Sequence, residues 1–182
     1  MSKSKSIAIA LGTSLLLTGV AFAEVAPYVG AEVISNNQSY SASGLEKNRL
    51  SSGVFVGARV HKNFGVEAGY NLSAKKKQTG NLKTSFSNMY VDALGYYPIA
   101  EQVELIGLVG VGRLKAKAQN LPAGYVINPS ILKAKIGLRL GIGAQYKVSD
   151  NLAVRVLARH QKVKNGLAKN NQSLGFGLTW SF

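Results

Sequence analysis

The chain has 182 residues, with 22 lysines and arginines against 8 aspartates and glutamates, and a formal net charge of +14 at pH 7. It contains no cysteine and only two histidines. This composition excludes a disulfide framework and a thiolate metal site, and it argues against a dedicated zinc site. We therefore expect no metal and no other cofactor.

The first 23 residues have the pattern of a secretory signal peptide. Lys3 and Lys5 supply a positive start, an apolar stretch runs from Ile7 to Val20, and a small-residue Ala-Phe-Ala sequence follows. Glycine, serine and threonine interrupt the stretch too often for the alternative, a retained membrane helix. We expect residues 1–23 to be removed and residues 24–182 to form one domain outside the cytoplasm.

The remaining sequence alternates between apolar and small or polar residues. In chain order, the alternating segments are 28–34, 52–62, 63–72, 88–98, 103–114, 132–148, 151–161 and 170–182. In segment 132–148, every even-numbered residue is apolar and every odd-numbered residue is Lys, Arg, Gly or Gln. Period two predicts a strand with two different faces, since a helix would scatter the two sets around its circumference.

Segment 103–114 is apolar on both faces, so its orientation stays ambiguous. Glu104 suggests that the residues at odd positions, Val103, Leu105, Val109 and Val111, face outward.

The links between these eight segments alternate in length. Long polar links span roughly residues 35–52, 74–85, 116–130 and 162–172, and the short links are HKN, PIAEQ and SDN. Strict alternation predicts an all-β, antiparallel up-and-down meander of eight strands, with every long loop at one end.

Charged residues at mid-strand positions, opposite the apolar face, indicate a transmembrane β-barrel. A soluble barrel would enclose its apolar face, whereas here the apolar face would contact lipid and the charges would face the lumen. About ten residues at roughly 3.3 Å each, tilted near 45°, cover roughly the 25 Å of an outer-membrane apolar band. The expected lumen ion-pair network comprises Glu32, Arg59, Glu67, Asp92, Arg139 and Arg155. The alternative for these residues is a narrow, gated ion path.

Aromatic residues fall beside the short links and the last strand's end. They are Phe64, Tyr97, Tyr146, Trp180 and Phe182. Because aromatic rings favour the membrane interface, this end is predicted to be the periplasmic rim.

The signal peptide, the eight alternating segments and the final "GFGLTWSF" together resemble the small eight-stranded outer-membrane β-barrels of Gram-negative bacteria, the opacity-protein and OmpA-barrel type within the porin-like group. The resemblance implies a place in the cell outer membrane. It also implies a signal for the barrel-assembly machinery, formed by Phe176, Leu178, Trp180 and Phe182. It says little about activity, because such barrels host unrelated functions.

Lysines gather in and beside the long links. Lys75, Lys76, Lys77, Lys83, Lys115 and Lys117 are the candidate residues for binding an anionic surface. We expect partners among outer-membrane lipid, lipopolysaccharide and anionic surface polymers, but no nucleic acid, and we expect a monomer. The predicted role is structural or surface-interacting, with a narrow porin-like channel as the alternative.

A lipid A-modifying enzyme is the weakest alternative. His160 is followed by no nearby serine before Ser173, and no carboxylate follows Asp150. A hydrolase needs a nucleophile, a base and an orienting acid within hydrogen-bond reach, so we expect no catalytic role.

Overall fold

The computed structural model describes residues 25–40, 48–74, 76–77, 83–119, 134–163 and 168–182, and the predicted signal peptide lies outside them. Nine strands are present: β1 Ala26–Tyr40, β2 Asn48–His61, β3 Phe64–Ser73, β4 Lys76–Lys77, β5 Lys83–Pro98, β6 Val103–Gln119, β7 Lys135–Lys147, β8 Leu152–Val163 and β9 Ala168–Ser181. Eight of these are long, and β4 has only two residues.

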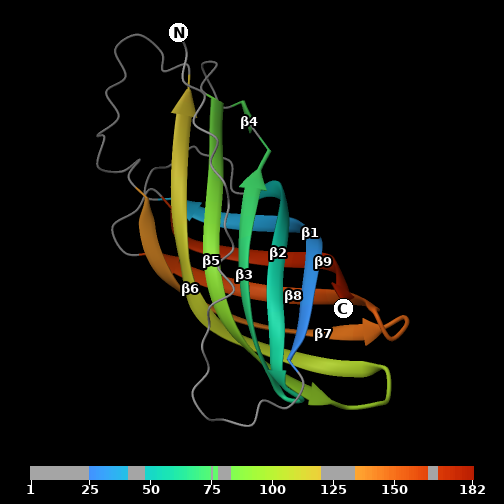
Figure 1. Cartoon of the computed structure of the whole chain (residues 1–182). Coiled ribbons are helices and arrows are strands. Elements are labelled where there is room, and N and C mark those ends of the chain that lie inside the picture. Colours follow the sequence, from blue (N-terminus) through green and yellow to red (C-terminus); the bar gives the residue numbers. More distant parts are fainter. Residues whose placement is uncertain (1–24, 41–47, 75, 78–82, 120–133, 164–167) are drawn as a thin grey trace, which may run out of the picture.

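The long strands form one closed antiparallel barrel (Figure 1). The order around the sheet is β3-β2-β1-β9-β8-β7-β6-β5-β4, and the additional pairing of β3 with β5 closes it. The first and last long strands, β1 and β9, are neighbours in a ladder that runs from Tyr28–Ser181 to Ser39–Asn170 and, after a shift of register, ends at Tyr40–Ala168. The predicted eight-stranded up-and-down barrel is therefore confirmed, with β4 as a short addition.

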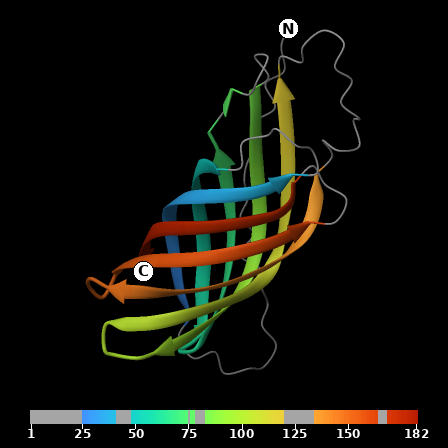
Figure 2. The same ribbon diagram turned by 180° about the vertical axis from the view of Figure 1, so that it is seen from behind.

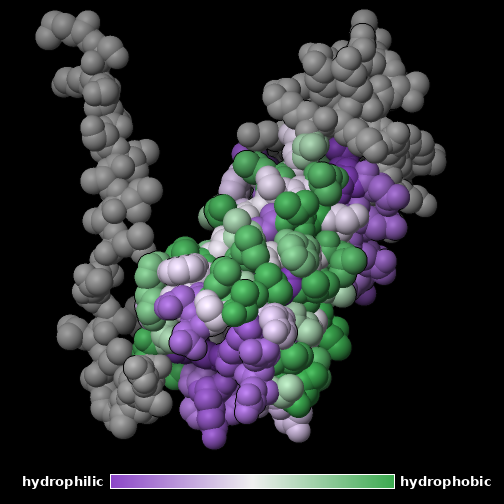
Figure 3. All heavy atoms as spheres, turned by 90° about the vertical axis from the view of Figure 1, so that its right-hand side faces the viewer, coloured by the Kyte–Doolittle hydropathy of each residue, from purple (hydrophilic) through white to green (hydrophobic). Residues whose placement is uncertain are grey.

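The apolar face of each strand points outward. In β2, Val54 is 61% exposed while its neighbour Phe55 is 2% exposed. The ambiguous segment follows the orientation suggested by Glu104, because Glu104 and Ile106 are buried and Leu105, Val109 and Val111 are exposed. In the space-filling view a hydrophobic band separates two hydrophilic regions (Figure 3).

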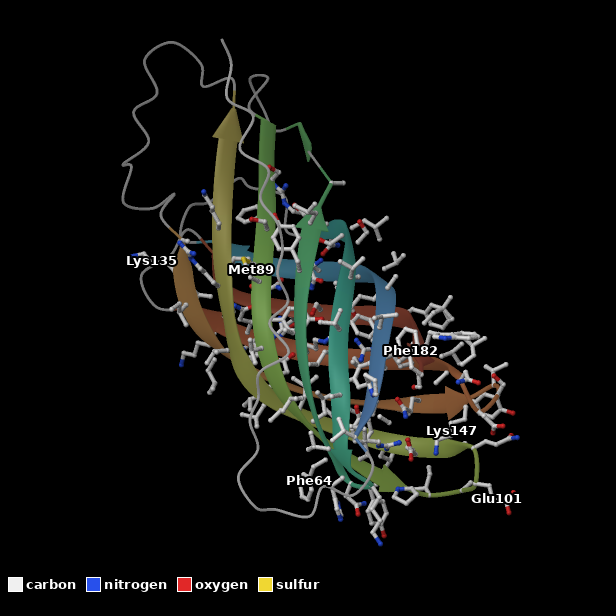
Figure 4. The ribbon with its side chains drawn as sticks, viewed as in Figure 1. Phe64, Met89, Glu101, Lys135, Lys147 and Phe182 are labelled. Atoms are coloured by element: carbon white, nitrogen blue, oxygen red, sulfur yellow. The ribbon has the colours of Figure 1, made fainter. Side chains whose placement is uncertain are left out.

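The two ends of the barrel differ in their connections. At one end, residues 62–63, 99–102 and 148–151 form the short links, and β1 begins and β9 ends there. Phe64, Glu101, Lys147 and Phe182 lie at this end, and Lys135 lies at the opposite end (Figure 4). All the longer connections join strand ends at that second end.

The strands continue further into the predicted long links than the sequence pattern indicated. Residues 35–40, 48–52 and 116–119, assigned to links above, belong to strands, and so do residues 168–172. The reason is that polar residues continue the alternation. Asn36 and Ser51 are buried in the lumen, where the Asn36 Nδ2 donates to the Ser51 Oγ at 2.8 Å. Polar inward positions extend a barrel strand as well as apolar ones do when their hydrogen bonds are satisfied.

No helix in the described part of the chain has the length and apolarity needed to cross a membrane.

Candidate functional site

Four ion pairs between carboxylates and arginines lie inside the barrel and are called here the lumen network. Its members are Glu32, Glu67, Asp92, Glu104, Arg59, Arg139, Arg155 and Arg159. The Arg139 Nε and Nη2 donate to the Asp92 carboxylate at 2.9 and 3.0 Å. The Arg155 Nη1 and Nη2 donate to the two oxygens of Glu67 at 2.6 and 3.1 Å. Both pairs are therefore bidentate, the geometry that favours arginine over lysine.

Two members of the lumen network were missed in the sequence. Arg59 pairs with Glu104 at 2.9 Å, and Arg159 pairs with Glu32 at 2.6 Å. The exposed head of Lys147 also reaches Glu104, at 3.2 Å. The two missed residues are Glu104 and Arg159. The alternation of inward and outward positions could have identified them, because Glu104 interrupts an apolar segment and Arg159 shares the inward face of Arg155.

Each pair joins strands that are not neighbours. Arg155 lies on β8 and Glu67 on β3, four places away in either direction around the barrel. This pair therefore crosses the lumen between opposite walls, and both side chains are buried. A buried charge is very costly unless paired, so these ion pairs are what permits charged side chains inside the barrel.

Aromatic rings pack against the arginines. The Arg155 guanidinium carbon lies 3.6 Å from the centre of the Phe55 ring, and the Arg139 carbon lies 4.0 Å from that of Tyr90. The hydroxyls of Tyr28 and Tyr90 donate to the Glu67 carboxylate at 3.3 and 3.1 Å. The network thus combines ion pairs, hydrogen bonds and cation–π contacts in one packed layer.

Glycines on the inward face make room for these rings. A Cβ at Gly57 would overlap the ring of Tyr28, and one at Gly69 would overlap the ring of Tyr90. The abundance of glycine opposite the apolar face, noted in the sequence, therefore has a packing cause.

Two separate cavities lie at the ends of the lumen. One of about 280 Å³ opens at the short-link end beside Arg59 and Arg155. The other, about 20 Å³, lies towards the long-link end among Asn36, Asn171 and Arg159. The lumen network lies between them, since Arg155 lines the first cavity and Arg159 lines the second. An eight-stranded barrel has just enough interior for its own side chains, and those of the lumen network occupy the space between the two cavities.

The long-link end carries the predicted lysines on adjacent strands, a group called here the basic rim: Lys76, Lys77, Lys83, Lys115 and Lys117. Lys77 pairs with Lys83 between β4 and β5, and Lys83 pairs with Gln119 between β5 and β6. Lys117 and Lys115 face Ser85 and Ser87 of β5. The ends of β5 and β6 rise above the other strands, with β4 beside them (Figures 1 and 2). Lys75 lies outside the described residues.

The candidate assembly residues share the outward face of β9. Phe176, Leu178, Trp180 and Phe182 are all exposed there. Phe176, Leu178 and Trp180 lie within β9, which pairs with β1 and so joins the last strand of the chain to the first, and Phe182 directly follows β9.

The two histidines lie in different parts of the barrel, His61 at the short-link end and His160 on the outward face of β8. His61 is exposed at the short-link end, where its Nδ1 accepts a hydrogen bond from the Asn63 backbone N–H at 3.2 Å. His160 faces outward on β8, whereas Ser173 on β9 pairs with the inward-facing Arg159, so the two side chains lie on opposite faces of the wall. Within the described residues, no three His, Cys, Asp or Glu side chains are placed to hold a metal ion.

Comparison with known proteins gives the family. Residues 8–182 match the family described as outer membrane protein beta-barrel domain. None of the curated proteins compared with the chain matches it.

Solved structures show the same fold. Neisserial surface protein A is 17% identical, with a TM-score of 0.69 over 88% of this chain and 100% of that chain. Ail, the attachment invasion locus protein of Yersinia pestis, solved in complex with the heparin analogue sucrose octasulfate, is 19% identical, with a TM-score of 0.64 over 88% of this chain and 100% of that one. The N-terminal barrel of Pseudomonas aeruginosa OprF is 14% identical, with a TM-score of 0.57 over 85% and 97% of the respective chains. With its closed barrel, outward apolar band and ion-paired lumen, the chain belongs to the outer-membrane β-barrel family and is a protein of the outer membrane.

Proposed function

We propose that this barrel is a surface-interaction protein whose basic rim binds anionic polymers at the cell surface. The observation that carries the proposal is the pairing of β4, β5 and β6 beyond the rest of the barrel. This pairing brings the lysines of the basic rim onto three adjacent strands at the long-link end. Lysines held close together create a positive potential that attracts sulfate, phosphate and carboxylate groups.

The net charge of the chain and the position of its acids support this proposal. The four buried carboxylates of the described residues, Glu32, Glu67, Asp92 and Glu104, are each paired within the lumen. They do not neutralise the basic rim. A relative of the same fold, Ail, has been solved with a sulfated sugar, which illustrates the class of ligand that we propose for this chain.

The alternatives have less support. A conducting channel would need a path through the lumen, where the Arg155–Glu67 pair joins opposite walls between two separate cavities. A lipid-modifying enzyme would need His160 beside a nucleophile, and the inward position of Ser173 does not provide one. We therefore propose that the barrel acts without catalysis, as a rigid base for the basic rim.

Retention on immobilised heparin tests the proposal. Replacing Lys76, Lys77 and Lys83 by Gln removes three charges, and we expect binding about tenfold weaker at low salt. The same three positions changed to Arg keep the charge and should retain binding. Lys62→Gln, at the short-link end, should also leave it unchanged. If the Gln variant elutes at the same salt concentration as the unmodified protein, the basic rim is not the binding element.

A further inference from the structure

A groove on the outer wall of the barrel is separate from both the lumen network and the basic rim. It has a volume of about 790 Å³ and lies across β7, β8, β9 and β1, the wall seen in Figure 2. One ladder row explains its shape, because Ile142 pairs with Ala158, Ala158 with Leu174, and Leu174 with Ser35. Large and small side chains alternate along this row, so Ala158 and Ser35 leave a depression between larger neighbours.

A polar edge borders the groove on the side of the long links. The next row towards that end runs from Leu140 to His160, Gln172 and Asn37. These three polar side chains are exposed on the outward face, and all three line the groove. Within the described residues, no side-chain hydrogen bond joins them to the rest of the barrel. Polar groups on a lipid-facing wall are costly unless they find hydrogen-bonding partners.

A lysine side chain lies just beyond this polar edge. Lys162 is the next outward residue of β8 after His160, and it is exposed. The groove therefore presents, in order, an apolar depression, a row of hydrogen-bonding groups and a positive charge. This order matches an anionic glycolipid, in which an acyl chain, a sugar and a phosphate follow in the same sequence.

The level of the groove determines which lipid it would meet. The polar edge lies at the long-link end of the apolar band, which is the outer side of an outer-membrane barrel. We propose that the groove binds lipopolysaccharide through its lipid A anchor, with one acyl chain over Ala158 and Ser35 and a phosphate beside Lys162. His160 and Gln172 then bond the sugar or phosphate oxygens. This proposal is independent of the proposed function, since it uses no residue of the basic rim.

The alternative occupants fit less well. A second copy of the chain would have to bury Lys162 and the polar edge against an apolar band, leaving a charge without a partner. A phospholipid could fill the depression and place its phosphate beside Lys162, but it carries no sugar whose oxygens His160 and Gln172 could bond. Binding of this kind also differs from general solvation by the bilayer, because it depends on the alternation of large and small residues in one row.

The test is the thermal stabilisation of the purified, detergent-solubilised barrel by added lipid A, measured beside phosphatidylglycerol. Ala158→Leu fills the depression, and Lys162→Gln removes the charge. We expect each to bind lipid A about tenfold more weakly than the unmodified protein. Ala93→Leu, an equally exposed alanine on β5, is the matched control and should bind normally.

The outcomes separate the possible occupants. Equal stabilisation of Ala158→Leu and Ala93→Leu by lipid A would overturn the proposal. So would equal stabilisation by phosphatidylglycerol, or a dimer that Ala158→Leu disrupts. The heat-dependent shift in gel mobility of folded barrels identifies any variant that fails to fold. In that case Lys162→Gln, which changes only an exposed head group, decides between the outcomes.

Discussion

The part of the barrel near the short links and the part near the long links differ in how they use charge. Near the short links and at mid-barrel, Glu67, Asp92 and Glu104 each bind an arginine from a strand that is not adjacent. Near the long links, the described lumen holds Arg49 among amides and hydroxyls such as those of Asn36 and Ser51, and the lysines of the basic rim lie on the projecting strands.

The difference between the two ends shows how one basic chain can form a stable membrane protein and also present a charged surface. Paired charges rigidify the interior, because each bond fixes two distant walls. The lysines of the basic rim lie on strand ends beyond the lumen network, and we propose that they bind partners outside the molecule. The chain therefore uses its basic residues in two ways, as arginines in ion pairs inside the barrel and as lysines of the basic rim.

The largest expected effect comes from breaking one pair of the lumen network. Arg155→Ala removes both bonds to Glu67 and leaves that carboxylate buried. We expect the free energy of unfolding to fall by about 3–5 kcal/mol. Urea unfolding of the barrel in lipid vesicles, followed by tryptophan fluorescence, measures the change.

A second substitution distinguishes charge from packing. Adding Glu67→Gln to Arg155→Met removes the orphaned charge and keeps most of the volume. This double variant should recover most of the lost stability. A double variant as unstable as Arg155→Ala would show that packing, not the ion pair, dominates at this position.

The next effect concerns the outer face of one strand. Val109→Arg places a charge within the apolar band of β6, and it should destabilise the barrel by about 2–4 kcal/mol. Lys115→Ala, on the same face near the long-link end, should change stability by less than about 0.5 kcal/mol. Similar costs at the two positions, in the same vesicles, would mean that the lipid boundary does not fall between them.

A smaller effect is expected at Gly69, which faces the lumen, and Gly107, on the exposed outward face of β6, serves as its control. Gly69→Ala brings a Cβ into the ring of Tyr90, whereas Gly107→Ala meets no atom within 4 Å. We expect Gly69→Ala to cost about 1–3 kcal/mol and Gly107→Ala to be close to neutral. Differential scanning calorimetry of both variants provides the comparison, and equal melting temperatures would rule out the packing role of Gly69.

Period two predicted the eight long strands, and the charged residues at mid-strand positions predicted which face is enclosed. Segment 103–114 needed only Glu104 for its orientation. The strand ends near the long links were wrong, since polar residues such as Asn36 resemble a loop unless their lumen partners are known.

The sequence pattern could not predict which arginine of the lumen network pairs with which carboxylate. Arg59 bonds to Glu104, and Arg159 bonds to Glu32, only because the ladder offsets bring these side chains to the same height. The groove on the outer wall could not be predicted from the sequence for the same reason. It depends on Ala158 and Ser35 meeting in one row across strands that are remote in the sequence.

The central claim is that the apolar face contacts lipid while the charged face is enclosed. Trp180 is the only tryptophan of the chain, it is exposed, and it lies on the outward face of β9 beside the short-link end. Its fluorescence in vesicles of brominated phospholipid tests the claim directly. We predict strong quenching, greatest when the bromines lie near the head groups, and little quenching by iodide in the water. Strong quenching by iodide with none by brominated lipid would contradict the account.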